Sequence, residues 1–126
     1  MNILEGLLYT KTHEWARQEG TEVIVGITDH AQSELSDVVF IELPKVGKQV
    51  KQEEPTAVIE SVKAAYDIYA PVSGRVTRVN TEIEKDPALV NKDPYGKGWL
   101  FVLEEVASEE FKKLMHQTQY EEFLKR

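Results

Sequence analysis

The feature that most constrains the fold is a succession of short segments with β-strand composition, separated at close intervals by turn residues. Segments such as EVIVGIT (22–28) and WLFVL (99–103) are rich in β-branched and aromatic residues, whereas the stretches between segments contain Gly, Pro, Asn and Asp. A chain with this many short strands and frequent turns folds as a β-barrel or sandwich. We therefore predict strands at residues 9–10, 14–18, 22–28, 38–43, 56–61, 65–69, 74–80 and 99–103.

Helices are predicted only as additions to these strands. Residues 29–35 follow Thr28, whose hydroxyl can cap a helix, and they place Ala31 and Leu35 four positions apart. Toward the C-terminus, apolar residues recur at helical spacing, so two more helices are expected over about residues 108–125.

The two C-terminal helices are expected to begin at recognisable caps. Ser108 precedes two glutamates, which favour the first turn of a helix, and TQYE (118–121) has the pattern of a capping box. We expect the apolar stripes of both helices to pack on the strands, and a partner-binding face is the alternative. Trp99, after the turn-like stretch NKDPYGKG (91–98), is expected to enter the core.

The composition limits the class of protein. With 126 residues, 14.4 kDa, 41% hydrophobic and 29% charged residues, the chain fits one globular domain over residues 1–126. A net charge of −7 disfavours nucleic acid and anionic membranes as partners. It suits a partner with a basic docking surface, and it is equally explained by solubility alone. The absence of cysteine excludes disulfides and thiolate metal ligands, and the first residues lack a signal or transit pattern, so a cytoplasmic location is expected.

Lys63 lies where two predicted strands meet in a hairpin. The segments 56–61 and 65–69 bracket the residues VKA, so a two-residue turn should hold Lys63 or its neighbour and project the side chain outward. An amine on a flexible stem at a rigid tip can be acylated at a reproducible position. The pattern alone favours an ordinary solvated turn lysine, and nothing in the periodicity overturns that interpretation.

Two short segments with weakly similar sequences flank this hairpin. VGKQV (46–50) precedes the strand that leads to Lys63, and VSGRV (72–76) follows the strand that leaves it. The two halves are consistent with a duplicated strand unit related by a pseudo-two-fold axis.

The segment ESVKAAYDIYAPVSGRV (60–76) resembles the lysine-bearing hairpin of biotinyl/lipoyl carrier domains. THEW (12–15), residues 25–47 and 90–100 and the paired C-terminal helices are similar to the H-protein of the glycine cleavage system, over nearly the whole chain. Biotin carriers typically have methionine on both sides of the lysine, whereas this chain has valine and alanine, which favours lipoate.

The resemblance implies a mainly β fold, a flattened β-barrel/sandwich hybrid of the biotinyl/lipoyl type, with a short internal helix and two C-terminal helices. The hairpin at about residues 56–70 would present Lys63 with an amide-linked lipoate. In the family, a surface cleft shelters the amine of the aminomethyl group that the lipoyl arm carries. The matching positions in this chain are Thr12, Glu14 and Asp67. Taken without the resemblance, the two acids could equally be solvated residues at strand edges.

The resemblance also implies a carrier rather than an enzyme. The lipoyl group would take an aminomethyl group from a pyridoxal-phosphate-dependent glycine decarboxylase and deliver it to a tetrahydrofolate-dependent aminomethyltransferase. Electrons would then pass to dihydrolipoamide dehydrogenase, and lipoylating enzymes would be further partners. The alternatives are an H-like protein that donates lipoate to other lipoyl domains or to a lipoate-linked modification system, and an unmodified binding module.

The chain departs from the family pattern at two positions near the lysine. Ser36 stands where glycine is usual before the strand at 38–43, which would cost stability if this position needs a positive φ, and Tyr66 stands where serine is commoner. The three histidines, His13, His30 and His116, lack the spacing of metal ligands, so no metal site is predicted.

Overall fold

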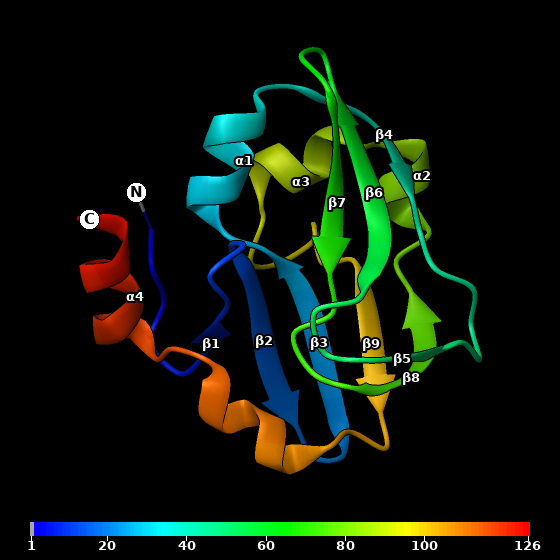
Figure 1. The fold of residues 1–126 in the computed structure, drawn as a ribbon. Coiled ribbons are helices and arrows are strands. Elements are labelled where there is room, and N and C mark those ends of the chain that lie inside the picture. The colour runs from blue at the N-terminus through cyan, green and yellow to red at the C-terminus, as the bar shows by residue number, and fades with distance from the viewer. Residues whose placement is uncertain (1) are drawn as a thin grey trace.

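The computed structural model describes residues 2–126 and places nine strands in two antiparallel sheets (Figure 1). The larger sheet has the order β1-β2-β3-β9-β8-β5, and the smaller has the order β4-β6-β7. The strands are β1 (Leu8–Tyr9), β2 (Glu14–Glu19), β3 (Glu22–Ile27), β4 (Val38–Glu42), β5 (Gln49–Val50), β6 (Pro55–Ser61), β7 (Ala65–Tyr69), β8 (Gly74–Val79) and β9 (Phe101–Glu104). The helices are α1 (Asp29–Leu35), α2 (Glu82–Lys85), α3 (Ala88–Lys92), the 3₁₀ helix η1 (Ser108–Lys113) and α4 (Gln117–Leu124).

The main core lies between the two sheets, which are not joined into a closed barrel. Strand β3 is a nearly continuous apolar run in the sequence because both of its faces are buried. Val23, Val25 and Ile27 point into the main core, whereas Ile24 belongs to a second cluster with Trp15. The mainly β, two-layer architecture with an internal helix and C-terminal helices confirms the predicted fold class.

The second cluster holds α4 against the first strands (Figure 1). The ring of Tyr120 on α4 stacks on Tyr9, with centroids 4.5 Å apart and an interplanar angle of 4°. Such a pair contributes about 1 kcal/mol beyond the burial of its area. The hydroxyl of Tyr120 also lies 2.9 Å from the Thr28 hydroxyl, so α4 is fixed by apolar and polar contacts together. The C-terminal stripe therefore packs on the strands, as predicted.

The helix starts at this end differ from the prediction. Residues 108–113 form a 3₁₀ helix whose N-cap is Ala107, so Ser108 does not cap it. The capping box of α4 pairs the His116 side chain with Gln119, two positions before the predicted TQYE box. An imidazole nitrogen can accept the same backbone hydrogen bond as a serine hydroxyl, and the sequence pattern for caps omits it.

Two short helices, α2 and α3, lie between β8 and β9 and were not predicted. Each has five residues or fewer, which is too short to show a helical period in the sequence. Trp99 packs against the second core cluster but is only partly buried, and the guanidinium of Arg78 lies 5.5 Å from its ring centroid. The expectation that Trp99 enters the core is therefore met only in part. Within residues 2–126, no helix combines the length and apolar character needed to cross a membrane.

The two similar segments, residues 46–50 and 72–76, pair with each other. Gln49 lies opposite Arg75 and Val50 opposite Gly74 in the antiparallel β5·β8 ladder. Antiparallel pairing of equivalent segments is what a two-fold relation between two halves produces, so the arrangement is consistent with the predicted duplication.

Ser36 ends α1 in a backbone conformation that side chains disfavour. Its φ of 65° and ψ of −152° fall in a region populated almost entirely by glycine. The position therefore does require a positive φ, as the usual glycine of the family suggested.

Replacing Ser36 with glycine is expected to raise the free energy of unfolding by about 1 kcal/mol, because it removes a strain of this order. Urea denaturation of the two proteins measures the difference. Ser33→Gly is the matched control, since Ser33 lies inside α1, where glycine costs about 0.5 kcal/mol relative to serine. Equal destabilisation by both changes would contradict the assignment of strain to Ser36.

Candidate functional site

The candidate site begins at the tip of the β6–β7 hairpin, which rises above both sheets (Figure 1). The backbone N–H of Ser61 donates to the carbonyl of Ala64 over 2.9 Å, so Val62 and Lys63 form the predicted two-residue connection. The Ser61 hydroxyl, which is buried, accepts hydrogen bonds from the backbone N–H groups of Lys63 and Ala64 at 3.1 and 3.4 Å. One side chain thus shapes the turn that presents Lys63.

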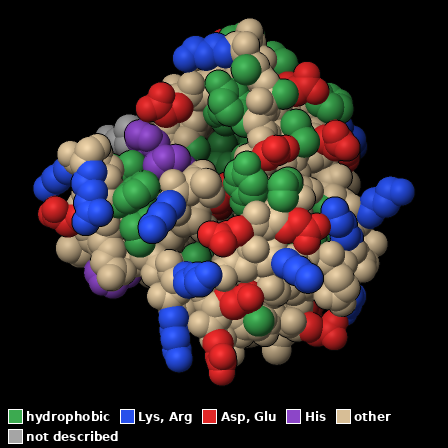
Figure 2. Space-filling model, viewed as in Figure 1, with side chains coloured by type: hydrophobic (Ala, Val, Ile, Leu, Met, Phe, Trp, Pro, Cys, Tyr) green, Lys and Arg blue, Asp and Glu red, His purple; other side chains and the backbone are tan. Residues whose placement is uncertain are grey.

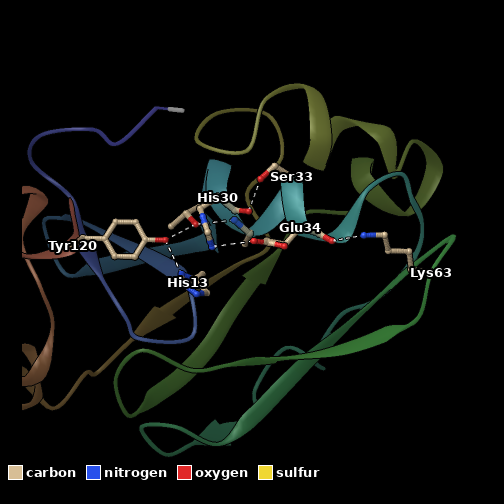
Figure 3. A network of polar contacts seen from close by, with 8 residues as sticks. His13, His30, Ser33, Glu34, Lys63 and Tyr120 are labelled. Atoms are coloured by element: carbon tan, nitrogen blue, oxygen red, sulfur yellow. Dashed lines mark hydrogen bonds and ion pairs between the residues drawn. The ribbon is translucent and has the colours of Figure 1, made fainter. Parts of the chain in front are cut away.

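The Lys63 side chain is exposed and reaches toward the C-terminal end of α1 (Figure 3). Its Nζ donates to the backbone carbonyl of Glu34 over 3.3 Å. The last carbonyls of a helix have no partner within the helix and carry a partial negative charge, which explains why an ammonium settles there. The contact is exposed, so it holds the amine only weakly.

The tip is also tied to the loop between α1 and β4. Val62 N–H donates to the carbonyl of Asp37 over 3.0 Å, and Val38 pairs with Ser61 in the β4·β6 ladder. The position of the lysine therefore depends on residues 36–38 as well as on its own hairpin.

Exposed apolar side chains surround this tip. Val62 is 65% exposed, and Val39 and Phe40 on the edge strand β4 are 54% and 52% exposed. Figure 2 shows hydrophobic side chains gathered in the upper part of the molecule, with acidic side chains among them. Large apolar groups in water beside a candidate attachment point are typical of a surface that contacts other proteins.

Glu14 lies at the other end of the candidate site and is almost completely buried. Its Oε1 accepts hydrogen bonds from the hydroxyls of Thr10 and Thr12, both at 2.5 Å, and its Oε2 accepts from the backbone N–H of Tyr69 over 3.2 Å. Glu14 starts β2 in the large sheet and Tyr69 ends β7 in the small one. The carboxylate thus connects the two sheets.

Burial raises the pKa of Glu14 above its ordinary value, and the hydrogen bonds from Thr10, Thr12 and Tyr69 counter only part of this effect. An ionised Glu14 is therefore short of stabilisation, which a cation placed nearby would supply. The residue lines a cleft of about 470 Å³ at the junction of the two sheets. The cleft is lined by Thr10, Lys11, Thr12, Glu14, Gln52, Glu53, Tyr69, Ala70, Pro71, Lys113 and Leu114.

Asp67 lies on the strand that leads from the tip to this cleft. It is exposed and lines a neighbouring hollow rather than the cleft of Thr12 and Glu14. Alternation along β7 puts Ala65, Asp67 and Tyr69 on one face, with Tyr69 about 13 Å from Ala65 at a rise of roughly 3.3 Å per residue. The structure therefore brings Thr12 and Glu14 together and places Asp67 between them and the lysine.

Tyr66 occupies the opposite face of β7. It pairs with Ile59 and alternates with the buried Ile68, and 37% of the residue remains exposed. The bulky ring that replaces the usual serine therefore points away from the face that carries Asp67.

Two histidines meet near α1 that the sequence did not connect (Figure 3). The rings of His13 and His30 lie 4.5 Å apart, and Nδ1 of His13 is 2.8 Å from the Tyr120 hydroxyl. Burial, and then the neighbouring His30, lower the pKa of His13. No group of three potential metal ligands occurs in the part of the chain that the structure describes, so this pair belongs to the packing of α4.

The comparison with known protein families decides the class of the chain. The family model described as glycine cleavage H-protein matches residues 7–126. The chain belongs to this family. Glycine cleavage system H proteins of Rubrobacter xylanophilus and Thermus thermophilus are similar to it. The first is 63% identical over 98 residues, 78% of each chain, and the second is 52% identical over 124 residues, 98% of this chain and 97% of the relative.

The fold agrees with the family. A crystal structure of a glycine cleavage system H protein from Mycobacterium marinum superposes with a TM-score of 0.88 and 36% sequence identity, covering 98% of this chain and 100% of that one. The family suggested by the lysine-bearing hairpin is thus confirmed. The H-protein is the carrier component of glycine cleavage, and the geometry of Lys63 and Glu14 now has to be explained in those terms.

Proposed function

We propose that Lys63 carries an amide-linked lipoyl group and that the chain acts as the shuttle of the glycine cleavage system in the cytoplasm, with no catalytic step of its own. The observation that supports this most is an exposed lysine at the tip of a rigid hairpin in an H-protein chain. Its partners in turn are the glycine decarboxylase, the aminomethyltransferase and dihydrolipoamide dehydrogenase, after lipoylating enzymes have modified the lysine.

The residues around Lys63 fit such a group. Ala64 and Ala65 leave room beside the attachment point, and the amine is held only by the exposed Glu34 carbonyl, so an enzyme can withdraw it at little cost. When bound, the lipoyl group supplies a disulfide that accepts an aminomethyl group and electrons. The hairpin keeps the arm on one molecule, so that each partner meets it at high effective concentration.

Thr12, Glu14 and Asp67 are proposed to receive the amine of the aminomethyl cargo. Glu14 is a buried carboxylate whose charge is under-stabilised, which favours binding of a cation. The Thr12 hydroxyl is held on Glu14, and Asp67 adds a second negative charge on the face of β7 between the tip and the cleft. Burial of the carboxylate also excludes the water that would remove the cargo.

The surface around the tip suits successive partners. The apolar side chains on β4 and at Val62 provide a small contact area, and the net charge of −7 attracts partners with basic surfaces. Small, charged interfaces form quickly and release quickly. A carrier that visits three enzymes needs both properties.

Peptide mass spectrometry of the protein from lipoate-replete cells tests the proposal. A lipoyl adduct is expected on the peptide that contains Lys63, and the peptide that contains Lys48, a lysine next to Gly47 in another turn, serves as the internal control. A lysine that stays bare in every preparation would contradict the carrier function, and adducts on both peptides would contradict the special role of the hairpin.

A further inference from the structure

The strongest feature outside the proposed site is a partly buried network of hydrogen bonds behind the hairpin tip, centred on Asn91 of α3. This residue lies in the stretch VNKDPYGKGW, whose sequence indicated only a turn. Its Nδ2 donates to the carbonyl of Ser36 over 2.7 Å and to Oε1 of Gln32 over 3.1 Å. Its Oδ1 accepts the backbone N–H of Val38 over 2.9 Å. The amide thus clamps both ends of residues 36–38 with its donor and its acceptor.

The clamped loop holds the tip. The carbonyl of Asp37, the residue between the two clamped positions, accepts the N–H of Val62 over 3.0 Å. Val38 also pairs with Ser61, whose hydroxyl receives the N–H of Lys63. Two short routes therefore lead from the Asn91 amide to the backbone of the lysine.

The loop would not keep this shape without the clamp. Ser36 is held at a φ of 65°, a conformation that costs a non-glycine residue about 1–3 kcal/mol and persists only where surrounding contacts enforce it. The hydrogen bond from Asn91 to the Ser36 carbonyl is one such contact. Loss of this hydrogen bond is expected to favour a negative φ at Ser36, which would turn the Asp37 carbonyl away from Val62.

We propose that Asn91 is a positioning residue for the carrier lysine: through the strained loop at Ser36 it fixes the hairpin tip in the orientation that a lipoylating enzyme reads. The inference rests on the proposed function of Lys63. The claim that Asn91 fixes the hairpin tip can be tested on the unmodified chain alone. Asn91 itself takes no part in the acylation.

The test compares Asn91→Ala with Asn80→Ala in the full-length, unmodified protein. Asn80 is a matched control because its side chain also donates to two carbonyls, those of Lys97 and Trp99, and accepts the N–H of Glu82. These partners lie outside residues 36–38 and outside the tip. Both variants should lose comparable global stability, so a difference between them reports on the tip.

Two measurements are made on each variant. Hydrogen exchange followed by NMR reports the Val62 amide, and kcat/KM for modification of Lys63 is measured with a lipoate–protein ligase, lipoate and ATP. Asn91→Ala is expected to speed Val62 exchange and to lower kcat/KM by about tenfold, in line with the cost of a misplaced reacting group. Asn80→Ala should leave both within about twofold of the wild type.

A double variant tests the route through Ser36. Glycine tolerates the positive φ, so the loop should depend less on the clamp when residue 36 is glycine. Adding Ser36→Gly to Asn91→Ala should therefore restore most of the kcat/KM that Asn91→Ala alone loses. Failure of this rescue, unchanged Val62 exchange in Asn91→Ala, or an equal loss in Asn80→Ala would each overturn the inference. If the wild type is not lipoylated at all, the proposed function fails, while Val62 exchange still decides the role of Asn91.

Discussion

Lys63→Arg is expected to abolish glycine-dependent turnover in a reconstituted system of decarboxylase, aminomethyltransferase, tetrahydrofolate and dihydrolipoamide dehydrogenase. A guanidinium stays protonated at any accessible pH and is not acylated by a lipoylating enzyme. Folding should be nearly unchanged, within about 0.5 kcal/mol, because the side chain is exposed and arginine can still donate to the Glu34 carbonyl. Turnover is followed as NADH formation after preincubation with lipoate and ligase.

Lys48→Arg is the control for this loss. Lys48 precedes β5 and forms an exposed ion pair with Glu54 at 3.8 Å, which arginine can keep. The Lys48→Arg variant should therefore support wild-type turnover. Full turnover by Lys63→Arg would mean that no acylated arm is needed, and the unmodified binding module would then be the function to pursue.

Glu14→Gln is expected to change the pH dependence of stability. The pKa of Glu14 is raised by folding above its ordinary value of 4.5, so the folded state binds the proton more tightly. The contribution of Glu14 to the free energy of unfolding is therefore largest below pH 4.5 and is lost as the pH rises through the folded pKa. Glutamine keeps the shape of the side chain without its charge.

The variant should thus gain stability relative to the wild type as the pH rises through that window. The gain is about 1.4 kcal/mol for each unit by which folding raises the pKa. Urea denaturation between pH 4 and pH 8 measures the difference. Glu53→Gln, which removes an exposed carboxylate from the same cleft, is the control for loss of a negative charge. A stability difference for Glu14→Gln that stays constant with pH would contradict the costly burial of its charge.

The same variant tests the role of Glu14 in holding the cargo. Loss of a charge-assisted contact with an ammonium, worth about 1.5–3 kcal/mol, should shorten the lifetime of the aminomethyl cargo by tenfold or more. Asp67→Asn should shorten it less than about fivefold, because exposed charge pairs contribute about 1 kcal/mol or less. Release of formaldehyde and ammonia from the loaded protein measures the lifetime. Unchanged lifetimes in both variants would remove both residues from the proposed site for the cargo's amine.

Much of the fold could be predicted because strands have a local signature. The eight predicted strands all occur, with ends that differ by one or two residues, and the two-residue turn at Lys63 is present. The two-residue strand β5 and the short helices α2 and α3 are the elements that strand and helix periods failed to reveal. Elements that span little more than one period carry too little pattern to be recognised in a sequence.

The candidate site likewise contains residues that the sequence could identify and residues that only the structure reveals. Lys63, Glu14 and Thr12 could be selected by residue type and resemblance, whereas Asn91 and the buried hydroxyl of Ser61 had no signal of their own. A partly buried amide that clamps a distant loop looks in sequence like any polar residue in a turn.

By itself, the sequence determined where the strands lie, which lysine occupies a hairpin tip and to which family the chain belongs, because these depend on neighbours along the chain. Only the tertiary structure decided that the Glu14 carboxylate accepts the backbone N–H of Tyr69, 55 positions away. The same holds for the hydrogen bond from the Asn91 side chain to the carbonyl of Ser36, which is also 55 positions away. Such pairs meet because the order of strands in two sheets brings their edges together. Hydrogen bonds between distant segments then fix the loop that carries the lysine and bury the carboxylate in the cleft.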